Sequence, residues 1–393
     1  MIGLFNDCFP PVMDGVSVTV HNYAKWLPRY GQKVCVATPR VPGVDYSAMD
    51  CSVLPYFSLP MPFRKPYRLG IPLVDAPFMY KIWGTRFELL HAHSPFSSGR
   101  LALDIARDRK IPLIATFHSK YRQDIERYVP NKLVVDMLMR RVIDFFNQAD
   151  EVWIPQPAVA DTLREYGYKG NYEVVENGCD FSVPYSLLAK DVCRRQLNVF
   201  EDKPVLLFVG QHILEKNVLF LIDSLAKVKS DFTMFFVGDG YAAKAMKNKV
   251  NRLGLEKKVR FVGKVCDRGK LMQYYAAADL FLFPSLYDNA PLVVREAAAM
   301  HIPSLVVEGA TSAEVIRDGI NGYVTVQSVE AFSKRVDHIL SDRELLEKVG
   351  LNACDTIVRK WSNIVQEVSD RYESLLRRYY NDVFYVSPNM VIS

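Results

Sequence analysis

The sequence predicts an α/β protein made of two parallel-sheet domains in tandem, and three observations support this. The chain has 393 residues, more than one ordinary hydrophobic core accommodates. Short apolar segments alternate with longer amphipathic segments, which is typical of parallel strands joined by helices. After a polar stretch around residues 177–198 the alternation begins again, so a second domain is expected.

The first domain is expected to cover residues 1–180. Its strands are predicted at the short apolar runs 2–6, 33–38, 88–91, 113–117, 151–154 and 172–176. Its helices are predicted over the amphipathic segments 17–30, 99–110 and 131–148. Gly15 lies in the turn before the first helix, where a ligand phosphate can approach a helix N-terminus closely. An ordinary turn glycine is the alternative, because the G-x-G-x-x-G pattern of dinucleotide binding is missing.

The second domain is expected to cover residues 181–360. Its strands are predicted at 205–210, 232–237, 259–262, 280–283, 304–307 and 322–324. Its helices are predicted at 218–229, 241–253, 269–277, 329–340 and 342–360. The last segment, 361–393, is expected to form an amphipathic helix and tail that pack back on the first domain. A cleft between two such domains is a common ligand site.

Composition excludes several classes of function. The net charge of +5 is small and spread along the chain, which argues against nucleic acid as a partner. The seven cysteines form no C-x-x-C pair, so neither a disulfide framework nor a zinc site is expected. No secretory signal is recognised at the start, and no apolar run reaches the roughly 18 residues of a membrane span. The expected location is cytoplasmic, with one face available to the inner surface of the cell membrane.

The most informative stretch is 281–300, which is predicted to form a strand, a polar turn and a helix. Pro291 suits the first helical position, and Asp288 or Asn289 suits the N-cap. The free N–H groups of a helix N-terminus bind anions, and the carboxylates of Asp288 and Glu296 accept hydrogen bonds from hydroxyls. The stretch therefore suits a ligand that carries both hydroxyls and phosphate. The alternative is a capped core helix with a solvated Glu296.

Three histidines follow predicted strands of the first domain, where parallel sheets bind their ligands. His91 and His93 resemble half of a metal site, but no further cluster of ligating residues completes it. His118 is better placed to hydrogen-bond a ligand, and a structural histidine is its alternative.

The order of these motifs resembles that of the family 4 retaining glycosyltransferases, and the resemblance extends along almost the whole chain. That family has the GT-B fold, in which two Rossmann-like domains face each other across a cleft. The resemblance rests on Gly15, His118, FVGQHILEKN (208–217), FVGDG (236–240), FVGKV (261–265), SLYDNAPLVVREA (285–297) and GINGYV (319–324). The segments HAHSPFSSG (91–99) and TFHSKY (116–121) are most similar to bacterial diacylglycerol glucosyltransferases.

The resemblance implies transfer of a hexose from a nucleotide-sugar, foremost UDP-glucose or a related UDP-sugar, to a lipid or saccharide acceptor. Such an enzyme would serve glycolipid or polysaccharide biosynthesis and would need neither a metal nor another cofactor. The catalytic residues that it implies are His118, Lys216, Asp288 and Gln211. The donor-binding residues that it implies are Gly15, Gly210, Gly263, Lys264, Val265, Asn289, Ala290, Pro291, Leu292, Val293 and Glu296.

The roles implied by the resemblance are chemically reasonable. Lys216 would neutralise the charge that builds on the departing diphosphate, and such preorganised positive groups are often the largest catalytic contribution. Asp288 would hold hydroxyls of the transferred sugar, Glu296 would hold the ribose, and the residues 263–265 would lie near the base. His118 would orient the sugar near its anomeric carbon. The leaving phosphate is thought to help deprotonate the acceptor, so no separate protein base is expected.

Two positions depart from the family's pattern. Gln211 stands where arginine is usual and brings no charge, and a protonated His212 would be one replacement for it. Asp288 stands where a longer glutamate is usual, and Asn289-Ala290 replaces a pair of phenylalanine and glycine. These departures leave two alternatives open, a nucleotide-sugar epimerase with the same fold and a weakly catalytic protein that binds carbohydrate or lipid.

The acceptor is expected on the first domain, next to residues suited to an anionic membrane surface. The residues expected to contact acceptor or membrane are Arg64, Lys65, Arg68, Lys120 and Tyr121. The basic residues that continue from Arg122 to Arg141 are interleaved with acidic ones, so an ordinary solvated face is the alternative.

Overall fold

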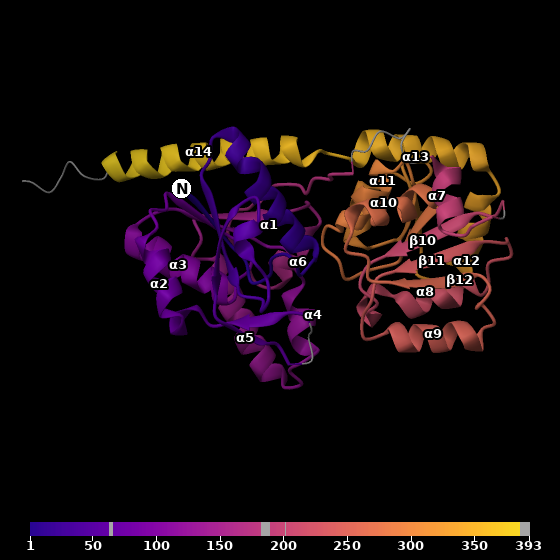
Figure 1. Ribbon diagram of the computed structural model, residues 1–393, viewed down its shortest axis with the longest axis horizontal. Helices are drawn as coiled ribbons and strands as arrows, with labels where there is room; N and C mark the ends of the chain where they lie inside the picture. The colour runs from indigo at the N-terminus through magenta and orange to yellow at the C-terminus, as the bar shows by residue number, and fades with distance from the viewer. Residues whose placement is uncertain (63–65, 182–188, 201, 386–393) are drawn as a thin grey trace, which may run out of the picture. The chain divides into compact units, whose positions relative to one another are not determined.

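A computed structural model describes residues 1–62, 66–181, 189–200 and 202–385 of the chain (Figure 1). The chain divides into two compact units. The first consists of residues 1–177 together with the segment from Trp361 onward, and the second is Gly178–Lys360.

The first unit is built on a seven-stranded sheet in which all strand pairs are parallel. The order of the strands is β3-β2-β1-β6-β7-β8-β9. Their bounds are Ile2–Phe5 (β1), Val34–Pro39 (β2), Ser52–Tyr56 (β3), Leu89–Ala92 (β6), Leu113–Thr116 (β7), Glu151–Ile154 (β8) and Glu173–Val174 (β9). Every residue of β1, β2, β6 and β7 is buried, as expected of parallel strands whose two faces are both covered.

Helices cover this sheet, and the first of them begins at a well-defined cap. Asp14 is the N-cap of α1, Gly15–Trp26, and its carboxylate accepts a hydrogen bond from the backbone N–H of Ser17, whose hydroxyl bonds back to the cap. The other α-helices of the first unit are Ala76–Gly84 (α2), Ser97–Arg109 (α3), Tyr121–Glu126 (α4), Lys132–Phe146 (α5), Val159–Glu165 (α6) and Trp361–Tyr385 (α14). An antiparallel pair, Ser58–Pro60 (β4) with Arg68–Gly70 (β5), and the helix α2 were not predicted from the sequence.

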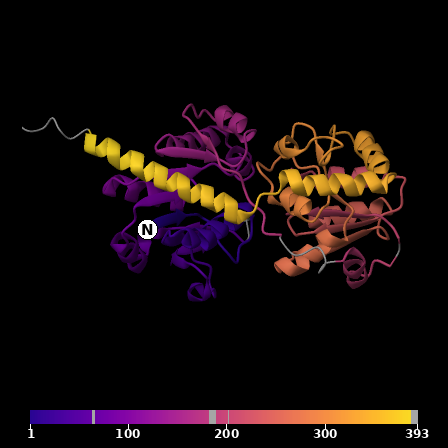
Figure 2. The same cartoon turned by 90° about the horizontal axis from the view of Figure 1, so that it is seen from above.

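The C-terminal helix α14 is part of the first unit and lies along it in both views (Figures 1 and 2). The Tyr372 ring stacks on the Trp153 ring with a centroid separation of 5.7 Å. The Tyr30 hydroxyl donates a hydrogen bond of 2.9 Å to the backbone oxygen of Ser362. The first turns of α14 are buried in the first unit through aromatic and aliphatic side chains, namely Trp361, Ile364, Val365 and Val368.

The second unit has a six-stranded parallel sheet with the order β12-β11-β10-β13-β14-β15. The strands are Val205–Val209 (β10), Thr233–Val237 (β11), Val259–Gly263 (β12), Leu280–Phe283 (β13), Ser304–Val307 (β14) and Tyr323–Thr325 (β15). The helices are Lys190–Gln196 (α7), Val218–Leu225 (α8), Ala243–Arg252 (α9), Arg268–Ala277 (α10), Leu292–Ala299 (α11), Val329–Leu340 (α12) and Arg343–Ile357 (α13).

Both sheets confirm the predicted fold class, two Rossmann-like domains with parallel strands. In each sheet the strand order reverses once, between β1 and β6 in the first unit and between β10 and β13 in the second. Ligands of open parallel sheets bind at such a switch point, beyond the carboxyl ends of the strands. None of the helices within the described residues is long and apolar enough to cross a membrane.

Candidate functional site

The loops at the switch point of the second unit are held together by backbone hydrogen bonds. Gly210 follows β10 with a φ of +156°, and Gly238 follows β11 with a φ of +140°, a backbone conformation that favours glycine. A Cβ atom on Gly238 would lie 1.9 Å from the carbonyl oxygen of Gly210, so the approach of the two loops requires glycine there. The N–H of Gly210 donates to Val237 and that of Gly238 to Gly263, at 3.0 and 2.9 Å. The three strand ends form one platform.

Lys216 and Asp288, predicted as catalytic residues, meet on this platform. The Nζ atom of Lys216 donates to Oδ1 of Asp288 at 2.8 Å, and the Ser285 hydroxyl donates to Oδ2 at 2.6 Å. The side chain of Lys216 is 12% exposed and that of Asp288 is 19% exposed, so solvent screens this ion pair less than a surface pair. Lys216 also lies 5.4 Å from the ring centroid of Phe283. The fold thus places a cation and a carboxylate side by side at the switch point.

Glu296 lies on α11 and is buried, which contradicts the alternative of a solvated glutamate. Its Oε1 atom accepts a hydrogen bond from Arg268 at 2.9 Å, and its Oε2 atom accepts one from the Tyr275 hydroxyl at 3.0 Å. Burial, together with the charge of Glu296, raises the pKa of Tyr275 well above its usual range. Because a carboxylate has about four acceptor positions, Glu296 keeps capacity for hydroxyls of a ligand.

The N-terminus of α11 differs from the prediction. Pro291 is the N-cap rather than the first helical residue, with φ of −67° and ψ of 119°, and no side chain caps the helix. The carboxylate of Asp288 is engaged by Lys216 and Ser285 instead, so the prediction that Asp288 or Asn289 caps this helix is wrong. The first N–H groups of an α-helix lack intrahelical acceptors, so those of Leu292 and Val293 still suit an anion.

His212 does not replace the charge that Gln211 lacks. Its side chain is buried, and its ring lies about 6 Å from the rings of Phe208, Phe236 and Phe261, with centroid distances of 6.2, 6.1 and 6.2 Å. Desolvation in this aromatic environment lowers the pKa of His212 to about 4. The imidazole is therefore neutral at pH 7, so a protonated His212 is ruled out as the replacement for the charge that Gln211 lacks.

The pKa of His212 gives a testable pH dependence. The unfolded chain binds a proton at this histidine near pH 6.5, whereas the folded protein does so only near pH 4. Its contribution to the free energy of unfolding is therefore complete above about pH 6.5 and declines by about 1.4 kcal/mol per pH unit as the pH falls toward 4. Denaturant unfolding of the protein and of His212→Leu between pH 8 and 5 should show a shallower pH dependence in the variant. Equal dependence would contradict the assignment.

The other residues of the second unit that were predicted to contact the donor lie at or just beyond the carboxyl ends of its strands. Gly263 ends β12 with a φ of +82°, and a Cβ atom there would meet open space. Lys264 and Val265 follow it at the carboxyl edge of the sheet, with Lys264 exposed. Gln211 is exposed at the end of β10, whereas Asn289 is buried.

Gly15 of the first unit is the first residue of α1, not a residue of the preceding turn. Its φ is outside the left-handed region, and a Cβ atom would meet no atom within 4 Å. Neither backbone conformation nor packing therefore explains a glycine at this position. Room for a ligand at the N-terminus of α1 remains as an explanation.

Three histidines at the ends of β6 and β7, His91, His93 and His118, form one group in which His91 and His93 are buried. The Nδ1 atom of His93 lies 3.0 Å from the Nε2 atom of His118, and the His91 ring stacks on that of His93 at 4.0 Å. His91 bonds the Tyr372 hydroxyl at 2.6 Å and the Thr116 hydroxyl at 2.7 Å, so both of its nitrogens are occupied. The half metal site that His91 and His93 resembled is thus a hydrogen-bonded group, and the described residues contain no cluster of three or more metal-ligating side chains.

All three histidines are neutral. Desolvation lowers the pKa of His118 to about 3, and burial also lowers the pKa of His91 and His93 well below the usual range. His118 is partly exposed at the carboxyl end of β7, while its ring is surrounded by protein. It can therefore contact a ligand as a neutral imidazole.

The residues expected to contact the acceptor or the membrane differ in their burial and in their contacts. Arg64 and Lys65 lie outside the described residues. Arg68 donates to the hydroxyl and the backbone oxygen of Ser58, at 2.7 and 2.8 Å, and so holds the β4–β5 pair. Tyr121 is buried and is not available to a membrane, which contradicts its predicted role. Lys120 is half-buried beside it.

Part of the basic face that continues beyond Lys120 is an ordinary paired surface. Arg122 forms ion pairs with Asp136 at 2.9 Å and with Glu126 at 3.4 Å. Exposed pairs of this kind contribute little to stability and leave less net charge for a membrane.

Sequence reasoning placed exposed apolar residues at 57–69 but missed those that follow, on α2 and in the turn before it. Tyr80 is 85% exposed and Leu73 is 73% exposed, on α2 and in the short helical turn before it. Neighbouring apolar side chains on β4, β5 and the same turn are also exposed, namely Leu59, Leu69 and Val74. The signal was the run of large apolar residues over 57–83, which periodicity alone does not distinguish from a buried segment.

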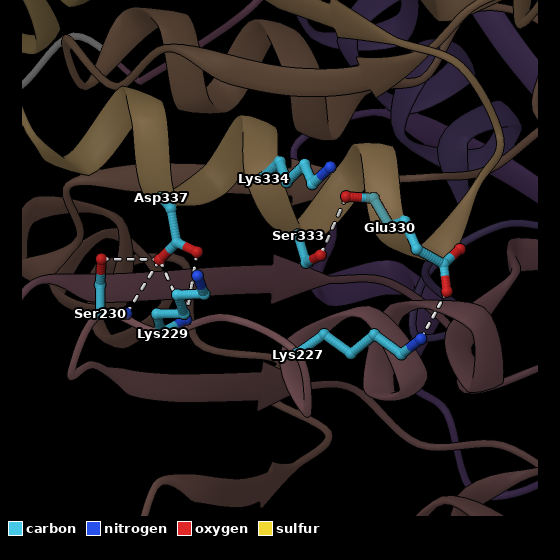
Figure 3. A pocket seen from close by; sticks show the side chains of 7 residues that line it. All are labelled: Lys227, Lys229, Ser230, Glu330, Ser333, Lys334 and Asp337. Atoms are coloured by element: carbon cyan, nitrogen blue, oxygen red, sulfur yellow. Dashed lines mark hydrogen bonds and ion pairs between the residues drawn. The ribbon is translucent and has the colours of Figure 1, made fainter.

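A surface hollow of the second unit lies away from these residues (Figure 3). Figure 3 shows Lys227 reaching Glu330, and Asp337 accepting hydrogen bonds from the backbone of Lys229 and Ser230. The hollow has a volume of about 460 Å³ and lies beside the residues that precede β11, at the amino end of that strand. Parallel sheets bind ligands at the opposite ends of their strands, so the hollow is not the candidate site.

Two family models match the chain over most of its length. The model described as Glycosyltransferase Family 4 matches residues 13–183, and the one described as Glycosyl transferases group 1 matches residues 189–355. Each of the two units is therefore matched by one of the two models.

Individual proteins are similar to this chain over most of its length. An alpha-monoglucosyldiacylglycerol synthase of Acholeplasma laidlawii is 24% identical over 90% of this chain and 91% of its own. A protein of the same name from Streptococcus pneumoniae is 25% identical over 77% of this chain and 70% of its own. A crystal structure of Anabaena Alr3699/HepE in complex with UDP and glucose superposes with a TM-score of 0.77 and 20% identity, covering 95% of this chain and 99% of that one.

Proposed function

This chain belongs to the family 4 glycosyltransferases and is a hexosyltransferase with the GT-B fold, and from that premise we propose its substrates. The donor is a UDP-hexose, foremost UDP-glucose. The acceptor is a lipid hydroxyl of the diacylglycerol class, and the product keeps the anomeric configuration of the donor. Two relatives named as glucosyldiacylglycerol synthases, and a neighbour crystallised with UDP and glucose, support this choice of substrates.

The observation that carries the proposal is the ion pair between Lys216 and Asp288. A bound diphosphate competes with Asp288 for the Lys216 ammonium, because both are anions. Once released from Lys216, the Asp288 carboxylate accepts hydrogen bonds from the sugar hydroxyls, while Ser285 keeps it in place through a bond of 2.6 Å. In the free enzyme Lys216 and Asp288 thus pair with each other. When the donor binds, Lys216 contacts the diphosphate and Asp288 contacts the sugar.

The remaining donor contacts follow from the same platform. Glu296 accepts hydrogen bonds from the ribose hydroxyls while Arg268 and Tyr275 hold its carboxylate in place. The N–H groups of Leu292 and Val293 face the diphosphate at the N-terminus of α11. In this proposal Gly15 and His118 contribute the phosphate and sugar contacts of the first unit.

In the transfer step the proton of the acceptor hydroxyl has a destination without any basic side chain of the protein. The bond from the anomeric carbon to the phosphate oxygen breaks, and the electron pair leaves with UDP. The acceptor oxygen bonds the same carbon on the same face of the sugar, and its proton passes to the departing phosphate. Lys216 stabilises the negative charge that develops on the leaving group. No step requires a metal or another cofactor, since this chain's own positive groups face the diphosphate.

The lipid acceptor is supported by the exposed apolar group on β4, β5 and α2. Large side chains such as Leu73 and Tyr80 expose apolar surface in the domain that is expected to carry the acceptor. Several large apolar side chains exposed on elements close in the chain are typical of surfaces that meet a partner or a membrane. We therefore propose peripheral binding to the inner face of the cell membrane through this group.

Transfer is tested with a panel of UDP- and GDP-sugars and diacylglycerol in anionic vesicles, read by mass spectrometry. A hexosyl diacylglycerol from UDP-glucose, with the α-configuration in the NMR spectrum of the product, is expected. A β-linked product would contradict retention, and a new sugar nucleotide formed without acceptor would indicate an epimerase. Failure to bind any UDP-sugar in calorimetry would contradict the donor.

The membrane contact is tested in the same vesicles. Leu73→Asp should lower sedimentation with the vesicles and lower transfer to diacylglycerol in them, while UDP binding stays unchanged. The matched control is Leu351→Asp, an exposed leucine on α13 of the second unit. Equal loss in both variants, or in neither, would contradict this surface.

A further inference from the structure

Three histidines of the first unit, His91, His93 and His118, form a continuous stack that ends at His118. The rings of His91 and His93 lie 4.0 Å apart at 26°, and those of His93 and His118 lie 5.3 Å apart at 23°. The Tyr23 ring packs edge-on against His93 and at a tilt of 56° against His91. The chain places these rings together because β6, which contains His91, is adjacent and parallel to β7. His93 and His118, just beyond the ends of the two strands, therefore meet.

One nitrogen in this stack determines the protonation pattern. The His93 side chain is 1% exposed, and its Nε2 atom has no hydrogen-bond partner among the described residues. A neutral imidazole has one N–H and one lone pair. A buried N–H without an acceptor costs about 1–3 kcal/mol, and orphaned donors are rarer in proteins than under-satisfied acceptors. The hydrogen of His93 therefore lies on Nδ1, and Nε2 carries the lone pair.

The position of the hydrogen on His93 determines which nitrogen of His118 carries its hydrogen. The Nδ1 atom of His93 lies 3.0 Å from Nε2 of His118, so His93 donates and His118 accepts. An imidazole that accepts at Nε2 carries its hydrogen on Nδ1. We propose that His93 is a positioning residue that holds the His118 ring and fixes it as the Nδ1–H tautomer, so that His118 meets the donor sugar as a hydrogen-bond donor.

The far end of the stack is anchored by the C-terminal helix. His91 bonds the hydroxyl of Tyr372 on α14 through Nδ1 and that of Thr116 on β7 through Nε2. Its ring is thereby held from two elements, and the ring of His93 rests on it. The low pKa values of the three histidines agree with neutral rings throughout, because burial disfavours their charged forms.

The tautomer is measured without any substrate. The chain has seven histidines, so ¹⁵N-histidine labelling gives few signals, and His118 is assigned from the signal lost in His118→Gln. Long-range ¹H–¹⁵N spectra at pH 7 should show His118 with its hydrogen on Nδ1 and His93 likewise. A hydrogen on Nε2 of His118 would overturn the proposal, whether or not the protein transfers glucose.

Variants of His93 test the positioning role, which rests on the proposed function. In His93→Phe, kcat for transfer should fall about 10–10²-fold because the ring of His118 loses its orientation, while the KM for the donor changes little. In His93→Asn, the side-chain amide lies near the position of Nδ1, so most of kcat and the His118 tautomer should be recovered.

The control is His338→Asn, an exposed histidine on α12 of the second unit that should leave kcat unchanged. Full activity in His93→Phe would contradict the positioning role, and so would equal losses in the Phe and Asn variants. If the wild-type protein transfers no sugar, the proposed function fails and the tautomer still decides the inference.

Discussion

Replacing Lys216 by alanine is expected to lower kcat for sugar transfer about 10²–10³-fold, because the leaving diphosphate loses its nearest side-chain cation. The ammonium lies 2.8 Å from Asp288 and only 12% of the side chain is exposed. Solvent therefore screens its charge less than that of a surface lysine. The measurement is steady-state transfer from UDP-glucose at saturating donor. The KM for the donor should change less than kcat, since the charge on the phosphate grows as the bond breaks.

The matched control removes another lysine ion pair from the same unit. Lys227 pairs with Glu330 beside the surface hollow, with both side chains more than half exposed. Lys227→Ala should leave kcat unchanged and alter stability by less than about 1 kcal/mol. Lys216→Ala also leaves Asp288 without its cation, so Lys216→Ala with Asp288→Asn separates the catalytic loss from the unpaired carboxylate. Full activity in Lys216→Ala would remove the basis of the proposed mechanism.

Replacing Glu296 by glutamine is expected to weaken UDP binding about 10–10²-fold. A hydrogen bond to a charged group contributes about 1.5–3 kcal/mol, which corresponds to this range of affinity. The amide has nearly the shape of the carboxylate but leaves the Arg268 guanidinium, now 2.9 Å from Oε1, without a counter-charge. Titration calorimetry with UDP measures the loss directly and needs no acceptor.

The control for Glu296 distinguishes ligand contact from internal structure. Tyr275→Phe removes the hydroxyl that donates to Oε2 at 3.0 Å but keeps the carboxylate charge. We expect a smaller loss of affinity in this variant than in Glu296→Gln. If Tyr275→Phe weakened UDP binding as much, Glu296 would act chiefly by holding α10 against α11, and its role toward the ribose would be wrong.

Most of the second sheet could be predicted from the sequence because its strands are buried on both faces. β10 (VLLFV) and β13 (LFLF) read as uninterrupted apolar runs, which is what a parallel strand covered by helices requires. In the first unit the edge strand β3 (SVLPY) and the pair β4–β5 escaped prediction. They are short and partly exposed, and β3 and β4 contain proline, so no periodicity identifies them.

The candidate site was predictable as a set of residues but not as an arrangement. Lys216, Asp288 and Glu296 were identified from their motifs, yet the sequence did not indicate that Lys216 and Asp288 bond each other. The sequence did not reveal which polar side chains are buried. A charged His212 was considered and Tyr121 was expected to contact acceptor or membrane, whereas both side chains are buried.

The alternation of strands and helices, the two domains, and the residue types at the strand ends all follow from the amino-acid sequence alone. These are local properties, since hydrophobic pattern and helix caps act over a few residues. Only the tertiary structure decided which of those residues meet. The order of strands brings β10 beside β13 and β6 beside β7, and this adjacency joins Lys216 to Asp288 and His93 to His118. The same packing sets the charge of the buried histidines, because removing an imidazole from water favours its neutral form.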